Sequence, residues 1–129
     1  MEILINFKRR LRGLILKNTM EIFKALEIPF RAVLLSSEEM GRVAVKTVDI
    51  EGWFPSQNSY RELGSCSNCT DYQARRSNIR YQDKGEIKFL HTLNNTAIAT
   101  ERAIVALVEN HQQPDGSIKM PKALWKYAG

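Results

Sequence analysis

The segment from Glu62 to Arg76 constrains this chain most, and it reads Glu-Leu-Gly-Ser-Cys-Ser-Asn-Cys-Thr-Asp-Tyr-Gln-Ala-Arg-Arg. It starts with strand-forming residues, passes through small polar residues and ends in helix formers. Thr70 and Gln73 have the spacing of a capping box, which predicts a helix from Thr70 to about Tyr81. The narrow residues 64–68 allow a ligand to approach the backbone closely. A purely structural strand–turn–helix would have the same composition.

The segment lies in a chain of 129 residues, which fits one domain over 1–129. No apolar run approaches the about 18 to 20 residues of a membrane span, and no signal peptide is visible, so we expect a cytoplasmic protein with no membrane partner. The net charge of +5 suits a nucleic-acid or nucleotide partner, but many soluble domains have such a surplus.

Cys66 and Cys69 form a C-x-x-C pair. Such a pair can be half of a zinc site or a redox pair. There is no second cysteine pair, and His91 and His111 do not have the spacing of a zinc finger. Two reduced thiols near a turn are the favoured interpretation.

Apolar residues at helical spacing predict a helix over about 9–26 that ends before Pro29, or two shorter helices with a break near 17–19. Four basic residues at 7–13 are compatible with a solvated face or with a polyanion contact. A buried strand is expected at 30–35, followed by a turn at 36–41.

Residues 47–54 alternate as a strand that pairs antiparallel with 60–67 through a turn at 55–59. Val48, Ile50 and Gly52 share one face, and Asp49, Glu51 and Trp53 share the other. Glu62 on the neighbouring strand could join the two carboxylates. Such a cluster is either a solvent-facing polar side or a site for cations, hydrogen-bond donors or a metal.

After the expected helix we predict a turn at 83–86, a strand over about 86–93 and a helix from about 97 to His111. Arg102 lies near the start of that helix, where the helix dipole favours anions. It would suit a bound anion, or it could pair with Glu101 or Glu109. We expect Trp125 and Tyr127 in the extended tail to pack on the body of the domain.

The phrase from Tyr60 to Arg76 resembles the seryl-tRNA synthetase phrase Tyr-Arg-Glu-Ile-Ser-Ser-Cys-Ser-Asn-x-x-Asp-Phe-Gln-Ala-Arg-Arg. The similarity runs from about residue 20 to the C-terminus. Residues 44–55 look like the family phrase Lys-Thr-Tyr-Asp-Leu-Glu-Val-Trp-Leu-Pro, and 91–102 resemble class II synthetase motif 3. The resemblance implies an α+β fold, a mainly antiparallel sheet flanked by helices, of the class II catalytic type but truncated.

The family ligates serine to tRNA(Ser) with ATP and Mg²⁺. Carried over by motif, the resemblance implies that Arg102 contacts the ATP γ-phosphate and that Arg102 and Glu62 are catalytic. Grouped by ligand, the resemblance implies these contacts: ATP at Glu62, Leu63, Gly64, Ser65 and Arg102; serine at Thr96 and Asn94; Mg²⁺ at Glu62 and Ser65.

The chain departs from the family pattern in lacking motif 1, motif 2 and the N-terminal coiled-coil arm, so it resembles only the C-terminal part of the catalytic domain. We therefore expect it to retain part of the ATP and serine site and not to aminoacylate tRNA efficiently alone. Two alternatives stay open: a non-enzymatic RNA- or protein-binding module, and one half of a split synthetase. Exposed sheet edges would favour a homo-oligomer or a second synthetase chain as partner, beside tRNA.

Overall fold

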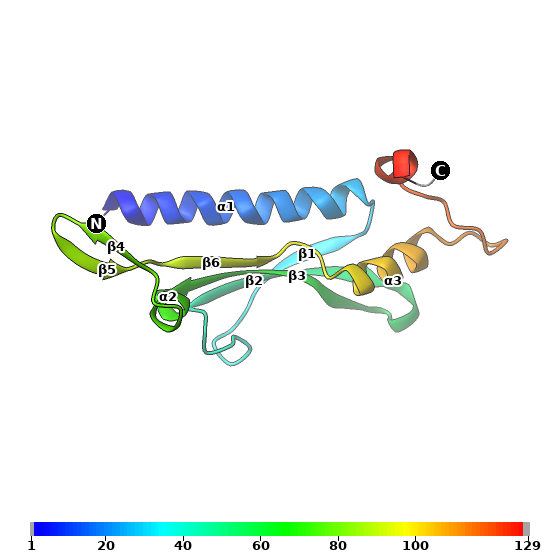
Figure 1. Cartoon of the computed structure of the whole chain (residues 1–129). Helices are drawn as coiled ribbons and strands as arrows, with labels where there is room; N and C mark the ends of the chain where they lie inside the picture. Colours follow the sequence, from blue (N-terminus) through cyan, green and yellow to red (C-terminus); the bar gives the residue numbers. More distant parts are fainter. Residues whose placement is uncertain (1, 128–129) are drawn as a thin grey trace.

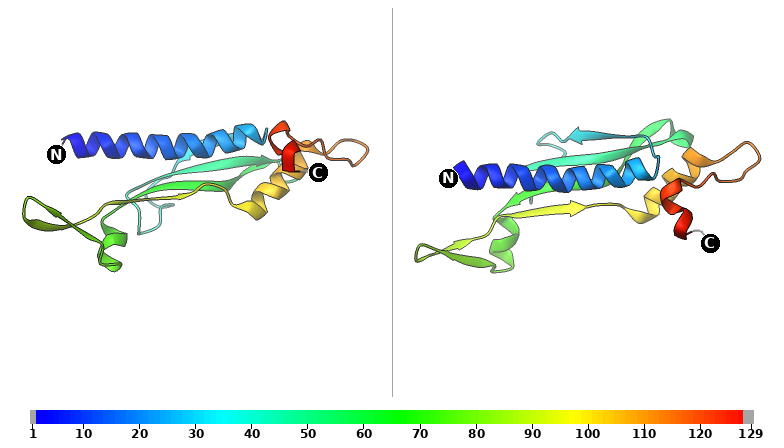
Figure 2. Two further views of the ribbon diagram at one scale, coloured as in Figure 1. Left: turned by 45° about the horizontal axis from the view of Figure 1, so that its top comes forward. Right: turned by 90° about the horizontal axis from the view of Figure 1, so that it is seen from above.

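The computed structural model describes residues 2–127, with side chains from residue 13 onward. A four-stranded antiparallel sheet in the order β1-β2-β3-β6 forms one layer, and helix α1 lies along one of its faces (Figures 1 and 2). The α+β, mainly antiparallel class is therefore confirmed. The strands of this sheet are β1 (Phe30–Leu34), β2 (Lys46–Phe54), β3 (Ser59–Thr70) and β6 (Thr92–Thr96).

Helix α1 (Glu2–Ala25) confirms the expected helix and shows it as one element instead of two. The helix ends at Ala25, and Glu27 in the turn after it, two positions before Pro29, has a left-handed backbone (φ 54°). Thr19, which is 1% exposed, accepts a hydrogen bond from Asn95 Nδ2 at 3.0 Å and thereby ties α1 to β6. The basic side chains at 8–12 lie outside the side chains that the structure describes.

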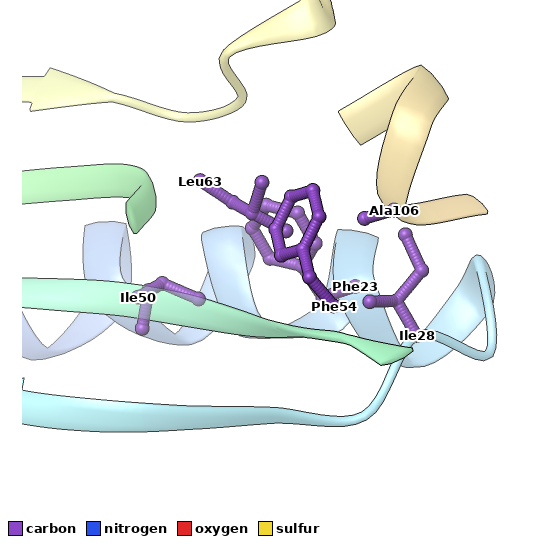
Figure 3. Close-up of a cluster of buried hydrophobic side chains, with 6 residues drawn as sticks. All are labelled: Phe23, Ile28, Ile50, Phe54, Leu63 and Ala106. Carbon is purple, nitrogen blue, oxygen red and sulfur yellow. The ribbon is translucent and has the colours of Figure 1, made fainter. Parts of the chain in front are cut away.

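The hydrophobic core lies between α1 and the sheet. Its buried side chains come from α1, the turn after it, β2, β3 and helix α3 (Thr100–His111). Removing this apolar surface from water is the main stabilising term of such a fold. Figure 3 shows these side chains gathered together: Phe23, Ile28, Ile50, Phe54, Leu63 and Ala106.

A β-bulge interrupts the pairing of β2 with β3. Ile50 pairs with Gly64 and Glu51 pairs with Glu62, so Leu63 is the extra residue. Leu63 is fully buried on the core side with Gly64. A Cβ on Gly64 would come within 2.7 Å of the Thr96 carbonyl oxygen, so the chain's own backbone occupies the space that we expected a ligand to approach.

The expected capping box at Thr70 is wrong. Strand β3 continues through the small polar residues to Thr70, and Cys66 and Cys69 are buried inside it, two residues before the turn at Asp71 in the case of Cys69. Helix α2 is only Tyr72–Arg76, its N-cap is Asp71, and no side chain caps it. Gln73 accepts a hydrogen bond from the Thr92 hydroxyl at 2.6 Å instead of reaching back to the helix start.

The expected continuation of that helix to Tyr81 is also wrong. A hairpin of β4 (Arg80–Asp83) and β5 (Glu86–Phe89) follows, with Lys84 and Gly85 at positive φ in its two-residue turn. The turn at 83–86 is confirmed. The strand expected over 86–93 is split between β5 and β6.

Two expectations about burial are corrected at the ends of the fold. Strand β1 is an edge strand with mostly exposed side chains, not a buried one. In the terminal 3-10 helix (Lys122–Tyr127), Trp125 and Tyr127 are 62% and 73% exposed, so they do not pack on the body.

A partner strand at the outer edges of β1 and β6 stays a prediction. In the described part of the chain, no helix is both long and apolar enough to cross a bilayer.

Candidate functional site

The face of the sheet opposite α1 is polar across three strands. Asp49 of β2 pairs with Ser65 of β3, which pairs with Thr96 of β6. Directly paired residues point to the same face, so these three side chains lie in one row. A parallel row consists of Thr47, Ser67 and Asn94.

The β-bulge adds Glu62 to this face. Glu62 and Ser65 are three residues apart and would point to opposite faces of a regular strand. Because Leu63 and Gly64 together oppose Ile50, Glu62 returns to the side of Ser65 and Asp49. The predicted meeting of Asp49, Glu51 and Glu62 is confirmed by the register, which pairs Glu51 with Glu62, and by their electrostatic contact with Asp49.

A cavity of about 430 Å³ opens over these rows. The loop between β1 and β2 and the start of α2 form its walls, on the side of the sheet away from α1 (Figure 1). Carboxylates, hydroxyls and amides supply its polar groups, a donor and acceptor set that suits a small polar ligand with a positive charge. Its lining residues are Leu35, Gly41, Val43, Ala44, Thr47, Asp49, Glu62, Ser65, Ser67, Cys69, Gln73 and Asn94.

Burial raises the pKa of the Asp49 carboxyl, and the neighbouring carboxylates of Glu62 and Glu51 raise it further. A hydrogen bond from the Ser65 hydroxyl opposes this shift. The ionised form of Asp49 is therefore held at a cost, which a bound cation such as an ammonium group would relieve.

Replacing Asp49 with Asn is expected to raise the free energy of unfolding at pH 7 by up to about 1 kcal/mol, after allowance for solvent screening. The pKa of Asp49 in the folded state lies above the usual 3.8. The protonated carboxyl is therefore tolerated in the folded wild type below pH 3.8, and the wild type loses stability as the pH rises through the raised pKa. Urea unfolding between pH 3 and pH 8 measures the difference.

Asp115→Asn is the matched control for this experiment. Hydrogen bonds from Ser117 lower the pKa of Asp115, so removing its charge should reduce stability above pH 4 instead of increasing it. An Asp49→Asn protein that is no more stable than the wild type at pH 7 would contradict the expected cost of this carboxylate.

A second cavity, of about 450 Å³, is lined by Phe54, Gln57, Arg61, Glu62 and Arg102. Arg102 does not pair with Glu101 or Glu109; its Nη1 donates to the Glu62 carbonyl oxygen at 3.1 Å and lies 3.4 Å from Glu62 Oε2. Glu109 instead accepts hydrogen bonds from Ser56. Glu62 therefore borders both cavities, with guanidinium groups on one side and carboxylate and hydroxyl groups on the other.

The structure places the residues implied by the resemblance in four environments: the first cavity, the second cavity, the surface and the core. Glu62, Ser65 and Asn94 line the first cavity, and Arg102 lines the second. Thr96 is exposed beside Ser65 but is not among the lining residues. The side chain of Leu63 is fully buried in the core, so Leu63 could meet a ligand only through its backbone.

Sequence reasoning missed three polar residues of the first cavity: Thr47, Ser67 and Gln73. The strand alternation already contained the signal for two of them, because Thr47 is two residues from Asp49 and Ser67 is two residues from Ser65. Gln73 was assigned to a capping box, and only the short α2 places it over the cavity.

Oxygen donors at the boundary of the two cavities fit a magnesium ion better than a softer metal. In the part of the chain that the structure describes, no three acidic, histidine or cysteine side chains are grouped closely enough to hold a metal by themselves. Mg²⁺ is commonly held by one or two carboxylates together with substrate phosphates, so Glu62 with Ser65 is compatible with that mode.

Comparison with known proteins identifies the family. The family model of the tRNA synthetase class II core domain (G, H, P, S and T) matches residues 10–111. The chain belongs to this class II family, and within it to the seryl-tRNA synthetases. It is 56% identical over 117 residues to the serine–tRNA ligase of Pyrococcus furiosus and 58% identical over 117 residues to that of Thermococcus kodakarensis.

Solved structures of this family agree with the fold. The chain matches the seryl-tRNA synthetase from Pyrococcus horikoshii complexed with ATP with a TM-score of 0.87 and 52% identity over 92% of its length. It matches the cytoplasmic serine–tRNA ligase from Naegleria fowleri in complex with AMP with a TM-score of 0.83 and 40% identity over 92% of its length. The chain covers 27% and 28% of those two chains, and 26% of both curated relatives.

Proposed function

We propose that this seryl-tRNA synthetase chain supplies part of a site that activates serine with ATP for ligation to tRNA(Ser), acting in the cytoplasm. The separation of charge on either side of Glu62 supports the proposal. Carboxylates and hydroxyls line one cavity, whereas Arg61 and Arg102 line the other.

The first cavity suits the amino acid. Asp49 and Glu62 offer carboxylates to the serine ammonium group, and Ser65, Ser67 and Asn94 offer partners to its hydroxyl group. Burial of Asp49 beside other carboxylates gives the cavity a preference for a cation. In this assignment Asn94 keeps its proposed contact with serine, and Thr96 would contact it only from the margin.

The second cavity suits the triphosphate. Arg102 projects from the first turn of α3, and Arg61 comes from β3, so two guanidinium groups border the same space. Guanidinium groups bind phosphate oxygens through charge-assisted hydrogen bonds. Glu62 at the boundary would hold Mg²⁺ together with Ser65 and the phosphates, and the ion would neutralise phosphate charge during transfer of the adenylyl group.

Replacing Arg102 with alanine tests this assignment. We expect the variant to bind the magnesium complex of β,γ-imido-ATP about 10- to 100-fold more weakly, a loss of about 1.5–3 kcal/mol for a charge-assisted hydrogen bond. Titration calorimetry measures the affinity. A seryl-sulfamoyl-adenosine analogue, which has no γ-phosphate, should lose less affinity.

Lys119→Ala is the control for charge, because Lys119 is exposed and borders neither cavity. Absence of binding of both compounds at millimolar concentration would rule out a preformed site in these 129 residues. Poor aminoacylation by these residues alone stays a prediction, and so does a second chain at the edge of β1 or β6.

A further inference from the structure

The α2 helix and the β4–β5 hairpin form a basic surface next to the first cavity. Residues 71–89 contain five basic and three acidic residues. The hairpin projects beyond the end of the four-stranded sheet, as both views show (Figures 1 and 2). We call the five basic side chains the hairpin surface: Arg75, Arg76, Arg80, Lys84 and Lys88.

All three acidic residues of this segment form ion pairs with two of its basic residues. Arg75 pairs with Asp71 at 2.7 Å, and Lys88 pairs with Asp83 at 2.8 Å and with Glu86 at 3.1 Å. The hydrogen bonds that Lys88 donates to Asp83 and Glu86 also raise the pKa of Lys88, so it stays charged.

The other three cations of the hairpin surface are Arg76, Arg80 and Lys84. Each is exposed, and within the described residues none lies within ion-pair distance of a carboxylate. The hairpin surface therefore presents three uncompensated positive charges in a chain whose net charge is +5.

Aromatic rings hold the arginines of this surface in place. Arg75 and Arg80 lie 4.8 Å and 5.0 Å from the centre of the Phe89 ring, and Arg76 lies 3.4 Å from that of Tyr72. Arg75 also donates to Asp71, and Arg76 donates one N–H to the Tyr72 carbonyl oxygen at 3.2 Å. Stacking on a ring does not use the remaining N–H donors, which can bind phosphate oxygens. Because its side chain is already ordered, less conformational entropy is lost on binding.

The hairpin surface is connected to the first cavity through α2. Gln73 lines that cavity and accepts a hydrogen bond from Thr92, which lies just beyond the hairpin. A long polyanion on the hairpin surface could therefore extend toward the cavity. Tyr81 on β4 is 37% exposed and offers a ring on which a base could stack.

We propose that the hairpin surface binds the phosphate backbone of the tRNA and so directs its acceptor end toward the first cavity. The proposal rests on the proposed function for the identity of the RNA. Phosphate contacts of this kind fix the position of a nucleic acid without reading its sequence. The hairpin surface therefore contributes affinity and salt dependence, and not the choice among tRNAs.

The test compares two triple variants of the whole chain, each lacking three positive charges. The first is Arg76→Gln, Arg80→Gln and Lys84→Asn, in which Asn suits the left-handed backbone at position 84 (φ 51°). The control is Lys24→Gln, Lys119→Gln and Lys122→Gln, which are exposed residues outside the hairpin. Fluorescence anisotropy with a labelled transcript of tRNA(Ser) measures affinity between 50 and 200 mM salt, conditions that resolve phosphate contacts.

The hairpin variant should bind the transcript at least about tenfold more weakly at low salt, and its slope of log affinity against log salt should be smaller by about 2. The control should stay within about threefold of the wild type. Equal losses in the two variants, an unchanged hairpin variant, or no binding by the wild type at 50 mM salt would each overturn the proposal.

Binding of β,γ-imido-ATP to the hairpin variant separates this proposal from the proposed function. The variant should bind the nucleotide as the wild type does, because none of its changed residues borders the Arg102 cavity. If no form of the chain binds the nucleotide while RNA binding still depends on the hairpin, the proposed function fails and the hairpin surface stands. Matching circular dichroism spectra and melting temperatures check that both variants are folded.

Discussion

Replacing Leu63 with alanine is expected to lower the free energy of unfolding by about 2–5 kcal/mol. Leu63 is fully buried among side chains from α1, β2 and α3, so truncation leaves a cavity in addition to the lost burial. Urea unfolding followed by circular dichroism measures the change as a shift of the midpoint. The variant should also bind the seryl-adenylate analogue more weakly, because Leu63 anchors the bulge that turns Glu62 toward the first cavity.

Leu34→Ala makes the same chemical change on the exposed edge strand, where Leu34 is 60% exposed. It should alter stability by less than about 0.5 kcal/mol. Similar losses for Leu34→Ala and Leu63→Ala would mean that the bulge residue is not a core residue in solution.

Phe23→Ala is expected to lower the free energy of unfolding by about 3–5 kcal/mol. Phe23 is fully buried, and its ring centre lies 6.0 Å from that of Phe30, so it joins α1 to the first strand as well as to the core. The same urea titration measures the effect. We also expect faster amide hydrogen exchange in α1, because this side chain is a main attachment of the helix to the sheet.

Leu14→Ala provides the comparison within the same helix, since Leu14 is 52% exposed. It should change stability by less than about 0.5 kcal/mol. If Phe23→Ala unfolds at the same urea concentration as Leu14→Ala, then α1 does not pack on the sheet as described.

The sequence predicted the elements whose hydrophobic residues recur with the period of a regular helix or strand. The alternation of Val48, Ile50 and Gly52 against Asp49 and Glu51 identified both the strand and its two faces. Helices α1 and α3 followed from apolar residues at helical spacing, although their first residues differ by several positions from the expected ones.

The second half of β3 could not be predicted in this way. Its small polar residues are typical of a loop, but here one face of the strand, which includes Cys69, lines the polar cavity, and Cys66 is buried on the other face. Pairing with both β2 and β6 supplies hydrogen bonds that override the local propensity. The same error extended the short α2 helix into the β4–β5 hairpin.

The candidate site was predicted where a motif or a strand face marked it, as with Glu62, Ser65, Asn94 and Arg102. Its walls were not predicted, because Leu35, Val43 and Ala44 reach the first cavity from a connection whose path depends on tertiary packing. The bulge could not be predicted from the sequence for a similar reason. It shows only in the pairing of β3 with its neighbour and not in the residues of β3 themselves.

The bulge also decides where β3 can change its length. Deleting a residue elsewhere in the strand would move every side chain on one side of the deletion to the opposite face, and so exchange cavity groups with core groups. Shortening by one residue at 63 or 64 would leave both halves of the strand in phase, because these two residues together oppose Ile50. The pairing of β3 with β6 has a second irregularity, between Asn68 and Thr70. Insertions and deletions during the evolution of this strand should therefore concentrate at these two positions.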